Sequence, residues 1–214
     1  MSEFKLEVPV VFIIFNRLDT VQRVFEKIRE ARPAKLYLIS DGAREGAAGE
    51  ALKVAQVRDY VDGHIDWECE VVRDYADHNI GCKMRIVTGL NNVFAKEEYA
   101  IIVEDDILPH DTFFRFCQEM LLRYREDDRI GMVSGCNMCA EYQTDQAYLF
   151  TKIPETWGWA TWRRVWETYD VDIPDWEQVK ASKYLQKHFG KWHGNEIMRG
   201  LDMVVKHGLE AWDY

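Results

Sequence analysis

Three adjacent carboxylates, Glu104, Asp105 and Asp106, follow directly on the apolar run that begins at Tyr99. Carboxylates this close together repel one another, raise one another's pKa values and cost stability unless a cation offsets them. No basic residue follows them closely in the chain. Mg²⁺ and Mn²⁺ prefer oxygen ligands and leave coordination positions for phosphate and water. The pattern therefore predicts a divalent-metal site that works on a phosphorylated ligand.

Two other interpretations of this acidic segment stay open. It is compatible with a solvated turn that caps a helix beginning near Pro109, because negative charge is favourable at a helix N-terminus, although Asp111 already supplies such charge. It is also compatible with a metal-dependent aspartyl-phosphate site. Such sites carry the acid at the first strand, and the first strand here ends in "FNR". The place of the acids after a buried strand favours the metal site.

Alternating strands and helices are expected to position these acids. Short apolar runs predict strands, and segments with helical spacing lie between them. The expected strands are residues 9–15, 35–40, 69–75, 99–104 and 130–135, and the expected helices are residues 19–31, 47–61, 86–96 and 110–127. Within the second helix, Leu52, Ala55, Val57 and Val61 are expected on one buried stripe. This alternation predicts βαβ units and a parallel sheet that is covered on both faces.

Ligands of such sheets bind at the carboxyl ends of the strands. Three polar clusters occupy those ends here, namely Asn16-Arg17, Ser40-Asp41-Gly42 and Glu104-Asp105-Asp106. We therefore expect residues from distant parts of the chain to converge on one edge of the sheet.

The second half of the chain is rich in tryptophan. Trp159, Trp162 and Trp166 fall at i, i+3 and i+7, which predicts the buried face of a helix. Trp157 and Gly158 come just before that helix, where an aromatic ring and an open backbone suit the apolar face of a sugar. No repeat or flexible linker separates the two halves, so we expect a single domain over residues 1–214.

The composition excludes several classes of protein. Of the 214 residues, 37 are acidic and 27 basic, giving a formal net charge of -10, which argues against nucleic acid as a partner. The first apolar run, "VPVVFIIF", is too short for a membrane span or a signal sequence, so we expect no transmembrane segment and a cytoplasmic location. Cys136 and Cys139 form a single C-x-x-C without a second ligand pair, which favours buried thiols over a zinc or redox site.

The motifs "PVVFIIFNR", "LISDGA", "NIGCKMR", "IIVEDDILPHDTFF", "TWGWATW" and "WDY" follow one another along nearly the whole chain. In this order and spacing the chain resembles the nucleotide-diphospho-sugar transferases of the GT-A fold, in particular the bacterial family 2-like glycosyltransferases. It is also similar to N-acetylglucosaminyltransferase I, whose metal motif is likewise Glu-Asp-Asp. The resemblance implies an α/β fold of GT-A type, with a Rossmann-like, mostly parallel sheet flanked by helices and a Trp-rich C-terminal acceptor subregion.

The same resemblance divides the domain into a nucleotide-sugar-binding half, residues 1–135, and an acceptor-side half, residues 136–214. The transferases that the chain resembles continue well beyond a "WDY" motif, with segments that close over the donor. We therefore expect this chain to be truncated at its C-terminus.

The resemblance also implies roles for the donor-side residues. Asp106 would ligate Mn²⁺ or Mg²⁺, Asp105 would hold the ribose and Glu104 would lie towards the sugar. Arg17 and Asp41 would sit around the uracil, and Asp41 suits this role because a carboxylate accepts the uracil N3 proton.

Two basic residues of the next helix are candidates for the diphosphate. Arg85 would face it, with Lys83 as the near alternative, and a solvated helix charge is the other interpretation of Arg85.

On the acceptor side, Trp157 and Gly158 are candidates for a sugar platform. Glu155 is a candidate ligand of an acceptor hydroxyl, or an ordinary surface-loop residue. Asp213, in the "WDY" motif, would take the proton from the acceptor hydroxyl, which requires a carboxylate near the metal but not bound to it. The other interpretation of Asp213 is an ordinary exposed acid at a helix end.

Together these roles imply a metal-dependent glycosyltransferase that moves a sugar from a UDP-sugar to a hydroxyl of a saccharide or lipid-linked saccharide. With Asp213 as an external base the reaction would invert the anomeric carbon. A peripheral place at the inner face of a membrane stays open, although no basic amphipathic helix supports it directly.

Two other functions stay open. A sugar-phosphate nucleotidyltransferase would carry a Gly-rich basic loop after the first strand, which "FNRLDT" lacks. A non-catalytic carbohydrate-binding module would explain the tryptophans but would need no metal carboxylates.

Overall fold

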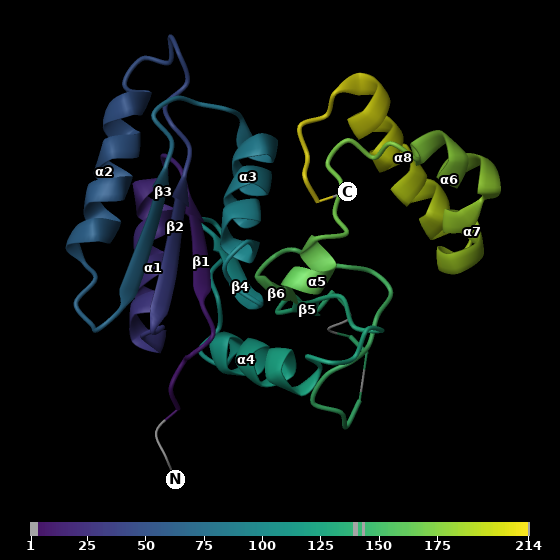
Figure 1. Ribbon diagram of the computed structural model, residues 1–214, viewed down its shortest axis with the longest axis horizontal. Coiled ribbons are helices and arrows are strands. Elements are labelled where there is room, and N and C mark those ends of the chain that lie inside the picture. The colour runs from purple at the N-terminus through teal and green to yellow at the C-terminus, as the bar shows by residue number, and fades with distance from the viewer. Residues whose placement is uncertain (1–3, 139–140, 143, 214) are drawn as a thin grey trace.

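A six-stranded sheet forms the centre of the computed structural model, which describes residues 4–138, 141–142 and 144–213 (Figure 1). The strands lie in the order β3-β2-β1-β4-β6-β5. Their bounds are β1 Val10–Ile14, β2 Lys35–Ser40, β3 Glu70–Tyr75, β4 Tyr99–Glu104, β5 Val133–Ser134 and β6 Trp159–Trp162. Neighbouring strands among β1 to β4 pair in parallel, whereas β6 runs antiparallel to both β4 and β5. The predicted Rossmann-like, mostly parallel α/β sheet is therefore confirmed.

The central strands are buried on both faces. In β1, Val10 and Phe12 point into one layer of the core, while Val11 and Ile13 point into the other. Helices α1 (Leu18–Ala31), α2 (Glu50–Gly63) and α4 (Phe113–Arg123) cover the first face, and α3 (Cys82–Phe94) covers the second. Such two-sided burial explains why these strands are continuous apolar runs.

In α2 the predicted stripe is correct at Val57 and Val61, but Leu52 is 64% exposed, Ala55 is also exposed, and Val54 is buried instead. The stripe therefore begins two residues later than expected.

The tryptophan-rich segment differs from the prediction. Residues 159–162 form strand β6, and only Arg163–Trp166 form a short helix, α5. Trp159 and Trp162 lie in opposite core layers, because successive side chains along a strand point to opposite faces of the sheet. The helical face predicted for Trp159, Trp162 and Trp166 is thus wrong, although all three rings are buried as expected.

Three further helices form a separate lobe beside the sheet domain (Figure 1), namely α6 (Trp176–Ser182), α7 (Tyr184–Phe189) and α8 (Lys191–His207). Inside the lobe, Trp176 is buried and donates from Nε1 to Asp202 Oδ1 at 3.0 Å. Within the described ranges, every helix is too short or too polar to serve as a membrane span.

After the lobe the chain returns to the second face of the sheet (Figure 1). Trp212 is buried there and stacks on Trp159 with the ring centroids 5.5 Å apart. The hydroxyl of Tyr169 donates to the carbonyl oxygen of Trp212 at 2.9 Å. These contacts fix the position of the residue that follows, Asp213.

Candidate active site

Arg17 joins the carboxyl ends of β1 and β4. Its Nη2 pairs with the buried Asp105, and its Nη1 lies 3.1 Å from Asp106 Oδ2. Asp105 also accepts a hydrogen bond from the backbone nitrogen of Phe15 at 3.2 Å. Burial raises the pKa of Asp105, while the Arg17 charge acts in the opposite direction. The cation beside the acidic segment therefore comes from the neighbouring strand, and with half of its side chain exposed Arg17 can still meet a ligand.

Glu104, the last residue of β4, lies among other acids and has a raised pKa. Burial raises its pKa to about 7, and the negative charges of Asp106, Asp213 and Asp105 act in the same direction. Arg17 makes the smallest of these contributions and is the one that lowers this pKa. A cation near these acids would offset their mutual repulsion, as the sequence predicts.

Asp41, the first residue after β2, holds the loop between β3 and α3. Its Oδ1 accepts from the backbone nitrogens of Gly42 at 2.9 Å and Ile80 at 3.1 Å, and its Oδ2 accepts from Gly81 at 3.1 Å. Gly42 approaches this loop so closely that a Cβ atom would lie 2.5 Å from the His78 carbonyl carbon. Because each carboxylate oxygen has about two acceptor sites, backbone donors already occupy most of Asp41. Its contact with a uracil stays a prediction.

Arg85 faces β3. Its Nη2 lies 2.5 Å from Asp74 Oδ1 and donates to the Asp74 carbonyl oxygen at 3.1 Å. With 8% of its side chain exposed, Arg85 is not the solvated charge that was one interpretation. Lys83 is half-buried and forms no ion pair within the part of the chain that the structure describes. Of the two basic residues predicted near the diphosphate, Lys83 is thus the one without a fixed acidic partner.

The C-terminal segment brings Asp213 to the acids that follow β4. Thr156 donates from its hydroxyl to Asp213 Oδ2 at 3.5 Å. The negative charge of Asp213 contributes to the raised pKa values of both Glu104 and Cys82. The predicted base and the predicted metal-site acids therefore share one region, although they are more than a hundred residues apart in the sequence.

The predicted acceptor-side residues flank Thr156. Trp157 is 59% exposed, and Glu155 is half-buried. Burial raises the pKa of the Cys136 thiol, and the nearby negative charge of Glu155 acts in the same direction. Gly158 has φ +76°, a conformation that favours glycine, and a Cβ atom there would lie 3.3 Å from Phe113. Gly158 is therefore packed against the domain, which leaves Trp157 as the exposed surface of the expected platform.

The helix-cap interpretation of the acidic segment is not supported by this geometry. Helix α4 begins at Phe113, with Thr112 as its N-cap residue, and Asp111 pairs with Lys27 at 2.8 Å. Asp106 precedes this helix by seven residues, and the effect of a helix dipole is confined to its first turn.

A metal ion fits this region only with help from a ligand. No group of three or more His, Cys, Asp or Glu side chains is arranged to hold a metal within residues 4–138, 141–142 and 144–213. Asp106, whose side chain is 46% exposed, is the accessible acid next to Glu104. The residues therefore fit a cation that takes its remaining ligands from a bound diphosphate and water. Cys139 of the C-x-x-C pair lies outside the described residues.

Several residues of the site escaped the sequence analysis. Arg58 of α2 donates to the carbonyl oxygens of Asp41 at 2.9 Å and Ala76 at 2.8 Å, which ties together the loops that follow β2 and β3. Glu210 approaches Gly81, where a Cβ atom would lie 2.9 Å from its Oε2. No local pattern marks either residue, because both act through contacts between distant segments.

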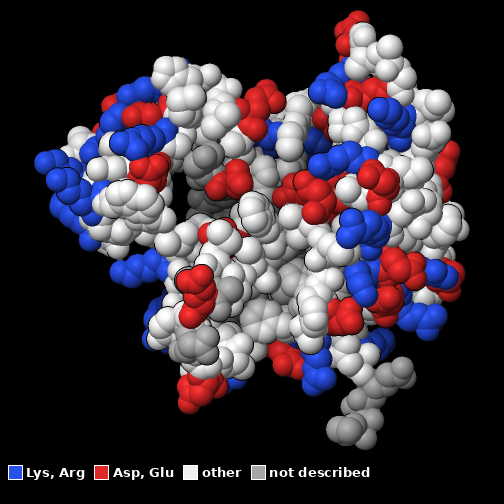
Figure 2. Space-filling view, turned by 180° about the vertical axis from the view of Figure 1, so that it is seen from behind, with Lys and Arg blue, Asp and Glu red and all other residues white. Residues whose placement is uncertain are grey.

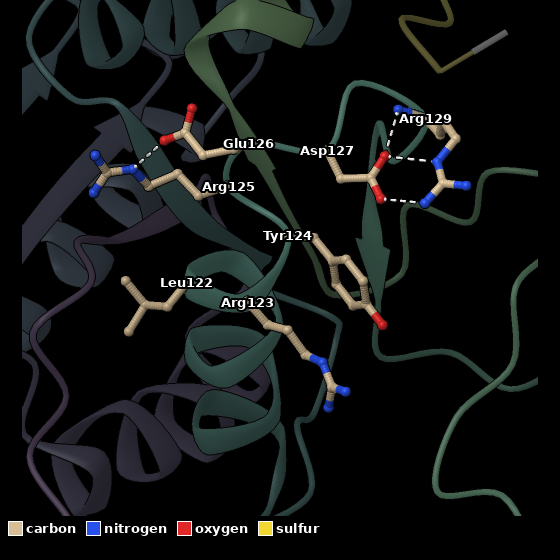
Figure 3. Close-up of a pocket in the computed structure, with 7 residues that line it drawn as sticks. All are labelled: Leu122, Arg123, Tyr124, Arg125, Glu126, Asp127 and Arg129. Carbon is tan, nitrogen blue, oxygen red and sulfur yellow. Dashed lines mark hydrogen bonds and ion pairs between the residues drawn. The ribbon is translucent and has the colours of Figure 1, made fainter.

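Acidic side chains surround a hollow between the helical lobe and the sheet domain (Figure 2). A pocket also lies around the C-terminal end of α4 (Figure 3). Arg129 and Asp127 pair there at 2.7 Å, and Arg125 lies near Glu98, at the opposite end of β4 from Glu104. This pocket at the end of α4 is therefore separate from the acids of the site.

Comparisons with known proteins give no family. No protein-family model matches the chain, and no curated protein matches it by sequence. Among solved structures it is similar to residues 1–349 of TarS from S. aureus, with 10% identity and a TM-score of 0.38 over 56% of this chain and 33% of that one.

Two nucleotidyltransferase structures are also similar. A cytidylyltransferase from Leptospira borgpetersenii has 8% identity and a TM-score of 0.44 over 91% of this chain and 73% of that one. A CMP:2-keto-3-deoxy-manno-octonic acid synthetase complexed with CTP has 12% identity and a TM-score of 0.42, covering 95% and 100%. Likenesses this weak carry no argument about activity, which must come from the residues of the site.

Proposed function

We propose that this chain is a metal-dependent glycosyltransferase that acts in the cytoplasm. It moves a sugar from a nucleotide-sugar donor, a UDP-sugar, to a hydroxyl group of a saccharide or lipid-linked saccharide. The observation that carries the proposal is the position of Asp213, which accepts from the Thr156 hydroxyl at 3.5 Å, next to the exposed Trp157, and whose negative charge reaches Glu104 at the end of β4. An acid near the reaction centre but apart from the metal ligand is what a general base requires.

On the donor side, Asp106 would hold Mn²⁺ or Mg²⁺ together with the diphosphate of the donor. When bound, such a cation would neutralise the charge that develops on the departing diphosphate. Arg17, expected beside the uracil, is half-exposed and lies 3.1 Å from Asp106, so we assign it, together with Lys83, to the phosphates. Asp105 is the candidate ribose ligand, and Asp41 holds the loop that would border the uracil.

On the acceptor side, Trp157 offers an exposed ring for an apolar sugar face, next to Thr156 and Asp213. The acceptor oxygen forms a bond to the anomeric carbon as the bond from that carbon to the diphosphate oxygen breaks. Asp213 takes the proton of the acceptor hydroxyl. Attack from the face opposite the diphosphate inverts the anomeric carbon, so an α-linked donor gives a β-linked product.

Nucleotidyl transfer is less well supported. Its triphosphate substrate needs a loop rich in backbone donors after the first strand. Here β1 is joined to α1 by three residues, Phe15, Asn16 and Arg17, and none of the three is glycine. A carbohydrate-binding module would account for Trp157 but not for the acids that meet at Glu104.

The proposal is tested by incubating the protein with a panel of UDP-sugars, Mn²⁺ and oligosaccharide acceptors, and by measuring UDP release. Asp213→Asn should lower kcat by about 10²- to 10⁴-fold, the usual contribution of general-base catalysis, with little change in the Kd of UDP. The matched control is Asp172→Asn, which removes an exposed acid outside the site.

An α-linked product from an α-linked donor, or full activity of Asp213→Asn, would overturn the assigned base. Release of pyrophosphate from UTP and a sugar phosphate would favour nucleotidyl transfer. Saccharide binding that ignores both UDP and Mn²⁺ would favour a binding module.

A further inference from the structure

The helical lobe carries a charge opposite to that of the rest of the chain. Residues 176–207 contain six Lys and Arg but three Asp and Glu, within a chain of net charge -10. Figure 2 shows Lys and Arg side chains gathered on the outer edge of the lobe, away from the acidic hollow. The lobe therefore has a net positive charge, whereas the remainder of the chain, which also carries many Lys and Arg, has a net negative charge.

Some of these cations serve the lobe itself. Lys180 pairs with Asp202, Lys206 lies 3.2 Å from the same carboxylate, and Arg199 pairs with Glu196 at 2.5 Å. The cations of this first set are neutralised locally.

A second set of cations is free. Lys183, Lys187 and Lys191 are exposed, and within the described parts of the chain they form no ion pair. Lys183 is the N-cap residue of α7, Lys187 lies in the last turn of α7, and Lys191 is the first residue of α8, just after Gly190, which has φ +80°. These three lysines are thus unpaired positive charges within the nine residues 183–191 of the lobe.

Two aromatic side chains stand among these lysines. Trp192 is 75% exposed, the highest value among the large hydrophobic residues that the structure describes, and Tyr184 is 49% exposed. Tyr184 stacks on His188 with the ring centroids 3.9 Å apart. Trp and Tyr with an apolar body and a polar edge are the side chains enriched at the membrane-water interface.

The turn at Gly190 joins two tightly packed helices, α7 and α8. Gly194 lies so close to α7 that a Cβ atom would be 2.6 Å from the carbonyl carbon of Leu185. Leu185 itself is buried. The exposed aromatics are therefore held outward by a packed support and are not part of an unfolded end.

We propose that this surface, Lys183, Tyr184, Lys187, Lys191 and Trp192, docks the protein on a membrane that contains anionic lipids. Unpaired lysines are attracted to anionic headgroups, and the exposed indole enters the interface. The net negative charge of the remainder is repelled by the same headgroups, so the lobe faces the membrane. This docking is independent of the proposed glycosyl transfer.

The test is co-sedimentation of the full chain with vesicles of phosphatidylcholine alone and of phosphatidylcholine mixed with phosphatidylglycerol. We expect binding to the mixed vesicles only, and its loss at high salt, where charges are screened within a few ångströms. Lys187→Gln combined with Lys191→Gln should weaken binding by about 25-fold, roughly fivefold for each charge removed. The matched control is Lys53→Gln with Lys96→Gln, two exposed lysines on the main body, which should bind as the unmodified chain does.

Trp192→Ala distinguishes a membrane from a soluble polyanion. Insertion of the indole predicts weaker vesicle binding for this variant, and quenching of Trp fluorescence by brominated lipid that is lost in Trp192→Phe. Vesicle binding that is unchanged in Trp192→Ala, or matched by soluble polyglutamate, would overturn the assignment to a membrane. Equal loss in the Lys53 and Lys96 control would show that net charge, and not this surface, governs binding.

Discussion

Glu104 gives a quantitative prediction about stability. Its pKa in the folded protein is about 7, against 4.5 for the free side chain, because of burial and the neighbouring acids. Between these two pH values the unfolded chain releases a proton that the folded protein retains. The free energy of unfolding is therefore unaffected below about pH 4, falls as the pH rises from 4.5 to about 7, and changes no further above that on account of this group. At roughly 1.4 kcal/mol for each pKa unit, the loss reaches about 3 kcal/mol.

Glu104→Gln removes this cost, because a neutral amide of similar shape cannot ionise. We expect the free energy of unfolding in urea, measured with a chelator present, to be higher in the variant by about 3 kcal/mol near pH 8 and equal near pH 4. Glu98→Gln, at an exposed acid before β4, is the control and should show no such pH dependence. A variant that is equally stable at both pH values, or less stable near pH 8, would refute the burial and repulsion that we assign to Glu104.

Two further predictions concern the support of the site and of the lobe. Arg17→Ala leaves the buried Asp105 without its guanidinium partner. We expect the free energy of unfolding to fall by about 2 kcal/mol, less than for a fully buried pair because Arg17 is half-exposed. Urea denaturation measures this loss, and an unchanged midpoint would contradict it. Gly194→Val pushes side-chain atoms against the Leu185 backbone. Amide hydrogen exchange should therefore accelerate within residues 176–207 while β1 stays protected. Uniform acceleration across the chain would show that the lobe and the sheet unfold together.

The sheet could be predicted because its strands are locally distinctive. Buried on both faces, β1 and β4 are continuous apolar runs, and alternation with amphipathic helices then specifies parallel pairing. The prediction failed at β6, where Trp159 and Trp162 fit helical spacing equally well. Pairing with β4, where Trp162 lies opposite Tyr99, decides the matter, and no local pattern contains that information.

The convergence of the candidate residues was predictable from the sequence, but their contacts were not. The carboxyl ends of strands identified the edge where Arg17, Asp41 and the acids after β4 converge. The pairing of Arg17 with Asp105, and the backbone donors that occupy Asp41, depend on the spatial approach of separate loops. The basic surface of the lobe escaped detection for a related reason, since its lysines are spread over two helices around a turn and not along one amphipathic helix.

The central claim is a metal-dependent nucleotide site at Asp106, and calorimetric titration of UDP with and without Mn²⁺ tests it most directly. We expect UDP to bind in the presence of Mn²⁺, to lose most of its affinity when the metal is removed, and to bind Asp106→Asn poorly under both conditions. Asp128→Asn, at an acid whose side chain is 94% exposed on the main body, should bind as the unmodified chain does. Binding of UDP that is unaffected by Mn²⁺ and by Asp106→Asn would contradict the claim.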